Sequence, residues 1–113
     1  INAHATATPT GDPVEAASLR EALGDAADAV PVSSTKAQHG HMLGAASAME
    51  LGVCILAMQH DFLPATAFLD DIDPVCALRH VPGAAERGVQ IRHTLSLSAG
   101  FGGTNTALVL SKR

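Results

Sequence analysis

The chain has 113 residues, of which 47% are hydrophobic and 16% charged, and its formal net charge is −4 at pH 7. This size fits one modest domain, which buries roughly two-thirds of the surface that its unfolded chain would expose. The acidic balance, with no cluster of lysine and arginine, excludes nucleic acid as an expected partner. No apolar run reaches the length of a membrane span, so we expect no membrane partner either.

The amino-acid composition is rich in alanine and poor in aromatic residues. There are 21 alanines but only three aromatic residues, all phenylalanine. Small side chains pack closely and bury little area each, which suits a helix covered on both sides or a piece of a larger protein. The chain starts at Ile1 with no initiator methionine or signal-peptide pattern, so we expect it to begin inside a longer polypeptide. Cys54 and Cys76 lie in unrelated contexts and predict free thiols in a reducing, cytoplasmic setting.

The first predicted element is a helix over "TGDPVEAASLREALG", residues 10–24. Asp12 is the expected cap, Pro13 suits the first helical position, and Glu15 completes a spacing like that of a capping box. The closing glycine ends the helix. Residues 30–35, "VPVSST", then predict a short strand.

A second helix is predicted over residues 44–60, and its side chains are apolar on nearly all sides, which predicts burial on every face. Glu50 is its only charged residue. Residues 62–88 are rich in proline and aspartate and predict an extended connection with short strands. An alternating strand over residues 89–97 and a buried strand over residues 106–113 then predict an antiparallel pair. This order of elements predicts an α/β fold.

Three loops carry the residues that could do chemistry: "NAHATATPTGD", "SSTKAQHGH" and "SAGFGGTN". Taken singly, each has an ordinary explanation, since loop histidines are common and glycines supply tight turns. A zinc site at His39 and His41 lacks a third ligand at a usual spacing, so we expect no metal. A phosphate loop at "GFGGTN" is disfavoured because no helix pattern follows it.

Taken together and in order, the three loops resemble the C-terminal part of the β-ketoacyl synthases, the condensing enzymes of fatty-acid and polyketide synthesis. That family has a His-Gly-Thr-x-Thr loop before Gly-Asp and an acidic helix, and this chain has "HATATPTGDPVEA". It has Ser-Ser-x-Lys, then Gly-His-x-x-Gly-Ala-Ala and a Glu, matched by "SSTKAQHGHMLGAASAME". "FLPATAFLDDIDPVC" resembles its Pro-Thr-x-Asn-Leu region, and "GFGGTN" its closing Gly-Phe-Gly-Gly-Thr-Asn. The resemblance covers essentially residues 1–113 and implies the C-terminal part of a thiolase-like layered fold, incomplete alone.

The resemblance implies a decarboxylative Claisen condensation, in which malonyl on an acyl carrier protein loses CO₂ and attacks an acyl thioester held on a cysteine. Neutral His4 and His41 would donate hydrogen bonds to the thioester carbonyl oxygen and stabilise the enolate. Lys36 would hold the electrostatics of the pair, with buried Glu50 as its ion-pair partner. The remaining matches are substrate-binding positions: Thr6 and Thr8 for the pantetheine arm and Phe101 as the gate of the acyl pocket. His39 has no counterpart role.

The sequence departs from the family pattern at four positions in these motifs. Ala5 stands where the family has glycine, Ala7 adds another Cβ to the same loop, and Leu97 and Ala99 stand where asparagine and phenylalanine are usual. These changes affect the expected shape of the pocket more than the fold. The nucleophilic cysteine, which belongs to the first half of these enzymes at a helix N-terminus, has no counterpart in this chain.

Two functional hypotheses follow from the resemblance. The first is an acyltransferase whose missing half or partner chain supplies the cysteine, working as a homodimer or heterodimer with an acyl carrier protein. No cofactor is expected beyond the carrier's phosphopantetheine. The second is a non-catalytic subunit similar to a chain-length factor, or an inactive fragment. Retention of His4, Lys36 and His41 favours the first, while Ala5, Ala7 and the absent cysteine favour the second. A plain α/β domain of another role is the third and least favoured explanation.

Overall fold

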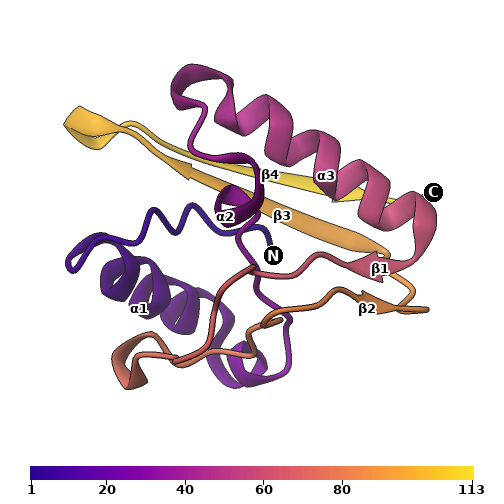
Figure 1. Ribbon diagram of the computed structural model, residues 1–113, viewed down its shortest axis with the longest axis horizontal. Helices are drawn as coiled ribbons and strands as arrows, with labels where there is room; N and C mark the ends of the chain where they lie inside the picture. Colours follow the sequence, from indigo (N-terminus) through magenta and orange to yellow (C-terminus); the bar gives the residue numbers. More distant parts are fainter.

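The computed structural model describes residues 1–113, and Figure 1 shows helices and strands mixed along the chain. The helices are α1 (Gly11–Leu23), α2 (Lys36–His39) and α3 (Ala46–His60). The strands are β1 (Phe62–Leu63), β2 (Glu86–Arg87), β3 (His93–Ala99) and β4 (Asn105–Ser111). Short 3₁₀ turns occupy Gly24–Asp28, Leu43–Ala45, Pro74–Cys76 and Phe101–Gly103. The predicted α/β class is therefore confirmed.

A hydrogen-bonded layer of extended segments runs through the molecule. β3 and β4 pair antiparallel from His93–Ser111 to Ala99–Asn105, as predicted. The first residues of the chain join this hairpin, because Asn2 forms parallel bridges to both Ser33 and Ser96. The layer continues from Val32 to His80 on the far side. Residues 1–3 thus lie in its middle, and His4 leaves the layer from a central position.

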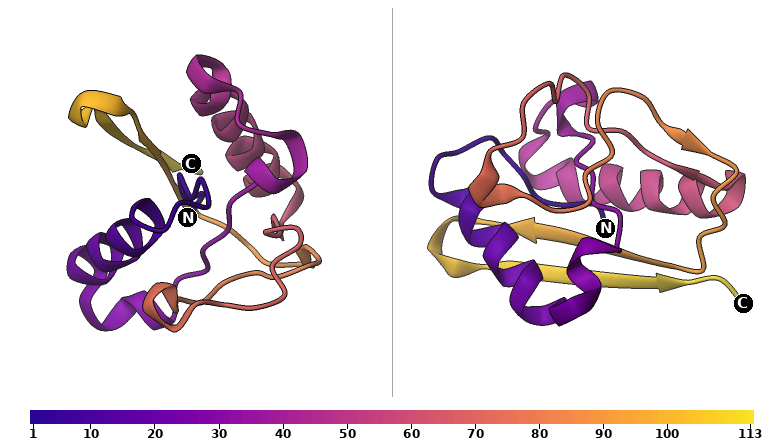
Figure 2. Two further views of the ribbon diagram at one scale, coloured as in Figure 1. Left: turned by 60° about the vertical axis from the view of Figure 1, so that its left-hand side comes forward. Right: turned by 90° about the horizontal axis from the view of Figure 1, so that it is seen from below.

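The two faces of this layer carry different helices (Figure 2). Successive side chains of a strand point to opposite faces. On β3, Thr94 donates to the Met58 sulfur at 3.6 Å and Ser98 accepts from Ser47 at 2.9 Å, so its even-numbered residues face α3. Its odd-numbered leucines pack on the side of α1, where the core cluster consists of Ala3, Leu19 and Val32. The hairpin therefore presents Ser98 to α3 and its leucines to the side of α1.

Helix α1 forms where the sequence predicts it, but its N-terminus is built differently. The helix begins at Gly11 after Thr10, which makes no side-chain capping bond. Pro13 lies in the first turn, where a missing N–H costs nothing. Glu15 does not close a capping box, because its carboxylate is engaged by the loop that carries His4. The expected roles of Asp12 and Glu15 as capping residues are therefore wrong.

Helix α3 is only partly covered, contrary to the expectation of burial on every face. Glu50 and Cys54 are buried, whereas Ile55 and Leu56 are 41% and 49% exposed. The reason is that α3 packs against a single layer of this chain, mainly against β3, so its other side has no partner. β4 is likewise exposed along nearly its whole length rather than buried, because it is an edge strand with no layer over it. Both findings leave apolar side chains of α3 and β4 exposed.

The apolar segment Leu43–His60 is also long and apolar enough to cross a membrane by length and composition alone. The statement that no run reaches this length is therefore wrong. Glu50 in the middle of the segment is fully buried in an ion pair with Lys36. A charged residue that is matched by a partner within the protein, together with packing against β3, favours a core helix.

The alternating strand predicted from residue 89 begins four residues later, at His93. Val89 and Ile91 pack instead against a second core cluster formed by Leu63, Ala65 and Val81. Because apolar alternation records which side chains are buried and not which backbone groups pair, it cannot distinguish a strand from an extended segment beside it.

Candidate functional site

The loop that carries His4 is held by one carboxylate. Glu15 of α1 accepts the backbone N–H of His4 at 2.7 Å and of Ala5 at 2.8 Å, one on each oxygen. Two charge-assisted bonds to adjacent amides fix the direction in which the chain leaves the central strand. Ala5 and Ala7 have positive φ angles of 27° and 59°, so the loop turns sharply where a Cβ is disfavoured.

The second contribution comes from α2, which begins with Lys36. The Lys36 ammonium donates to a Glu50 carboxylate oxygen, and only 6% of the lysine side chain and none of the glutamate side chain is exposed. The ion pair expected from the sequence is therefore present. The other Glu50 oxygen is buried with no hydrogen-bond partner. The pair joins α2 to α3 beneath the histidines and places a positive charge beside them.

His4 and His41 meet in space although 37 positions separate them in the sequence. Their ring centroids are 5.8 Å apart and their planes stand at 86°, an edge-to-face arrangement. Both rings line one open cavity of about 210 Å³. The other walls come from the start of α3 and the far end of the hairpin, including Ser47, Ser98 and Thr106. Two imidazoles thus face a space that could hold a small polar group.

The surroundings favour a neutral ring at His4 and set which nitrogen of a neutral His41 carries the proton. Burial lowers the pKa of His4 below its ordinary value of 6.5, and the nearby charge of Lys36 lowers it further. The Nδ1 atom of His41 accepts the backbone N–H of Leu43 at 3.2 Å. Because an accepting nitrogen carries no proton, neutral His41 carries its proton on Nε2. The ring therefore offers one N–H donor in a defined direction.

The other residues predicted for the site fall into two groups. Thr6 lines a second cavity of about 430 Å³ together with Lys36 and His41. Thr8 is exposed, and its hydroxyl accepts the backbone N–H of Gly11 at 3.0 Å. Phe101 is fully exposed at the tip of the hairpin and does not line the cavity that the histidines share. The structure of this chain therefore brings Thr6 to the site, but not Thr8 or Phe101.

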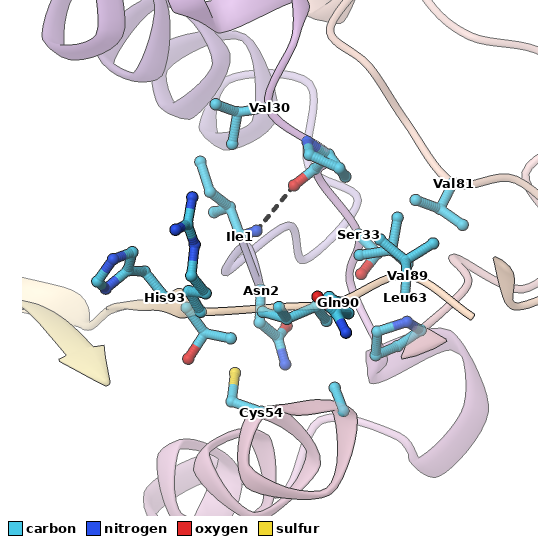
Figure 3. A pocket seen from close by; sticks show the side chains of 16 residues that line it. Ile1, Asn2, Val30, Ser33, Cys54, Leu63, Val81, Val89, Gln90 and His93 are labelled. Carbon is cyan, nitrogen blue, oxygen red and sulfur yellow. Dashed lines mark hydrogen bonds between the residues drawn. The ribbon is translucent and has the colours of Figure 1, made fainter. Parts of the chain in front are cut away.

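The two cysteines lie where packing residues are expected. Cys54 is buried in the middle of α3 and Cys76 is half-buried at the end of a 3₁₀ turn, and both are free. Burial raises the pKa of both thiols above the ordinary value, which disfavours the reactive thiolate. Figure 3 shows Cys54 in a different cavity, of about 280 Å³, next to Asn2 and without either site histidine.

Sequence reasoning missed the contacts of two residues beside the site. Glu15 was explained by helix capping, yet it holds the His4 loop. His39 was given no role, yet both of its ring nitrogens are engaged, one by the Thr35 hydroxyl and one by the Gly40 carbonyl. The only signal for either was its position beside a motif residue, which does not show where a side chain points.

The chain is similar in sequence to a known family of enzymes. Residues 1–70 match the family model described as "Beta-ketoacyl synthase, C-terminal domain". The 3-oxoacyl-[acyl-carrier-protein] synthase 2 of Coxiella burnetii is 47% identical over 112 residues, which is 99% of this chain and 27% of that protein. This chain thus spans about a quarter of the length of the curated relatives it matches.

Two solved structures superpose on nearly the whole chain. The ishigamide ketosynthase/chain length factor matches with a TM-score of 0.93 and 35% identity, over 99% of this chain and 27% of that one. A type II polyketide ketosynthase in complex with its acyl-carrier protein matches with a TM-score of 0.93 and 30% identity, over 97% of this chain and 27% of the other. The predicted fold, part of a thiolase-like layered architecture, is confirmed by these matches.

Proposed function

Because the chain belongs to the family of β-ketoacyl synthase C-terminal domains, we propose that residues 1–113 form the C-terminal region of an acyltransferase that condenses malonyl and acyl thioesters. The observation that carries the proposal is the His4–His41 pair, 5.8 Å apart in one cavity beside the Lys36–Glu50 ion pair. Its substrates belong to fatty-acid or polyketide synthesis, the two pathways that the names of its relatives represent.

The reaction places specific demands on these residues. When the malonyl thioester loses CO₂, the electron pair of the broken C–C bond moves onto the thioester and negative charge develops on its carbonyl oxygen. The N–H bonds of neutral His4 and His41 would both point to that oxygen, where preorganised donors are worth about 3 kcal/mol each. The α-carbon then attacks the acyl thioester on the cysteine, the new C–C bond forms and the cysteine leaves as thiolate.

Lys36 has a supporting role in this proposal. Its ammonium group is buried and paired with Glu50, so it is shielded from solvent. Burial is the main reason why the pKa of His4 is lowered, and the positive charge of Lys36 lowers it further and so also favours the neutral ring. Lys36 also lines the cavity that contains Thr6, through which a phosphopantetheine arm would reach the histidines. No other cofactor enters the proposed reaction.

The partners follow from the same proposal. An acyl carrier protein delivers the malonyl group, and the segment outside this chain, or a partner chain, supplies the cysteine. The matching solved structures include a ketosynthase with its acyl-carrier protein and a ketosynthase/chain length factor, which supports a carrier-dependent enzyme that forms a dimer. Thr8 and Phe101 would contact substrate only once that segment is in place. We further propose the cytoplasm as the location.

The experiment is a turnover assay on the intact protein that contains this chain. Supplied with an acyl thioester and malonyl on an acyl carrier protein, it should release one CO₂ for each 3-oxoacyl product. If the intact protein binds a ketosynthase as a dimer but neither takes up acyl groups nor releases CO₂, the chain is instead part of a chain-length-factor-like subunit and the proposal is wrong.

A further inference from the structure

The ring of His39 lies across the short helix α2. Its Nδ1 is 2.8 Å from the carbonyl oxygen of Gly40, and its Nε2 is 3.0 Å from the hydroxyl of Thr35. A carbonyl oxygen only accepts, so Nδ1 carries the proton and Nε2 of the neutral ring accepts from the threonine hydroxyl. The ring therefore connects the residue before α2 to the residue after it.

The two ends that this ring connects border the residues of the site. Lys36 follows Thr35 directly, and His41 follows Gly40 directly. Thr35 is only 1% exposed, and its backbone oxygen also accepts the Gln38 N–H at 2.9 Å, so it is a fixed anchor. Gly40 has a φ of 79°, in the left-handed region, and sets the direction in which the chain enters His41.

We propose that His39 is a positioning residue, which rests on the function proposed above. It fixes the Gly40 carbonyl against the buried Thr35 and thereby sets the orientation of the His41 ring, without touching substrate itself. No other side chain bonds to the Gly40 carbonyl. The other hydrogen bond of this residue is a backbone bond, from the Gly40 N–H to the Lys36 carbonyl. Loss of the bridge would let the peptide at Gly40 rotate and would tilt the donor of His41.

A purely structural role makes a different prediction. If His39 only stabilised α2, its loss would lower the melting temperature and leave turnover per folded molecule unchanged. If it positions His41, its loss lowers kcat with little change in KM, because the carbonyl oxygen is stabilised less in the transition state while substrate binding is kept. A displacement of well under 1 Å is enough for about a tenfold loss of rate.

The test uses variants of the intact enzyme. His39→Phe keeps a ring without nitrogen atoms, and Thr35→Val removes the hydroxyl without changing the shape. We expect each to lower kcat about tenfold with KM within about twofold, and the double variant to be no slower than His39→Phe alone. Thr35→Ser keeps the hydroxyl and should keep the rate. His93→Phe is the matched control, because His93 also bonds a hydroxyl, that of Ser111 at 2.9 Å, at the opposite end of β3.

Several outcomes would overturn the inference. A His39→Phe enzyme with the wild-type kcat would do so, as would losses from the two single variants that multiply in the double variant. Failure of both single variants to fold would show that the bridge serves the fold instead. If the wild-type intact protein itself shows no condensation, the proposed function fails, which is a separate result from a wild-type rate in the variant.

Discussion

At the scale of single residues, the site combines a buried charge pair with two histidine rings. Lys36 and Glu50 are expensive to bury singly, because each would lose its hydration without a partner. Together they place one positive charge beside His4 and join two helices. The same ion pair thus contributes both to the fold and to the protonation state of His4.

Removal of one member of that pair should be costly. Lys36→Met in the intact protein leaves Glu50 buried without a partner, and we expect a loss of about 3–5 kcal/mol in the free energy of unfolding. Lys36→Met with Glu50→Leu should recover most of it. The control is Arg79→Met, which breaks the half-exposed Arg79–Glu86 pair at 3.2 Å and should cost at most about 1 kcal/mol. Equal losses in denaturant unfolding for the buried and the exposed pair would contradict this account.

The lowered pKa of His4 makes stability depend on pH with a definite sign. The unfolded chain takes up a proton near the ordinary pKa of 6.5, whereas the folded protein does so only at lower pH. The folded state is therefore destabilised as the pH falls below about 6.5, and the full loss is reached below the folded pKa. Denaturant unfolding between about pH 8 and pH 5 should show wild type losing stability relative to His4→Gln. A difference between them that stays constant over this range would contradict the lowered pKa.

At the scale of elements, the strained loop after the central strand is the clearest cost in the structure. Ala5 and Ala7 have φ angles in or near the left-handed region, which costs an alanine about 1–2 kcal/mol. The Glu15 carboxylate, with bonds of 2.7 and 2.8 Å to two loop amides, holds the loop in this shape. Strain of this kind persists where the surrounding contacts determine the backbone.

Glycine should relieve that strain. Ala5→Gly and Ala7→Gly in the intact protein should each raise the free energy of unfolding by up to about 1 kcal/mol, because strain relief exceeds the added freedom of the unfolded chain. Ala17→Gly is the control, since Ala17 is exposed within α1 and its replacement should cost about 1 kcal/mol. A loss of stability at Ala5 as large as at Ala17 would show that the loop is not strained.

The sequence predicts the elements well where local rules decide them. The proline and glycine that bracket residues 10–24 predict α1, and the alternation around Leu95 with the turn at residues 100–104 predicts the hairpin. The Lys36–Glu50 pair follows from the rule that a buried carboxylate needs a partner. The contacts of Glu15 and His39 could not be predicted, because each depends on which backbone groups a loop or a short helix leaves beside its side chain.

At the scale of the whole molecule, the chain has one covered face and one open face. The open face is formed by α3, the turn before it and β4, with Leu43, Leu56 and Leu108 between 45% and 77% exposed. Apolar composition predicted that α3 is buried, but burial depends on layers that this chain does not contain. Since the chain spans about a quarter of its relatives' length, we expect the remainder of the synthase to cover this face.

Isolated residues 1–113 should therefore associate. We expect oligomers in sedimentation at micromolar concentration, because a contiguous apolar face of this kind is seldom left open to water. A Leu56→Glu and Leu108→Glu double variant should reduce the association. Val75→Glu, at an exposed position in the turn Pro74–Cys76 away from this face, is the control and should not. A stable wild-type monomer would contradict the account.

The central claim is that His4 and His41 direct their N–H bonds to one thioester oxygen, and single-turnover condensation in the intact enzyme tests it most directly. His4→Ala and His41→Ala should each lower the rate about 100- to 1,000-fold, while the unfolding midpoint stays close to wild type. His60→Ala, at the exposed end of α3, serves as the control and should keep the rate. A folded His4→Ala or His41→Ala enzyme that condenses at the wild-type rate would contradict the claim.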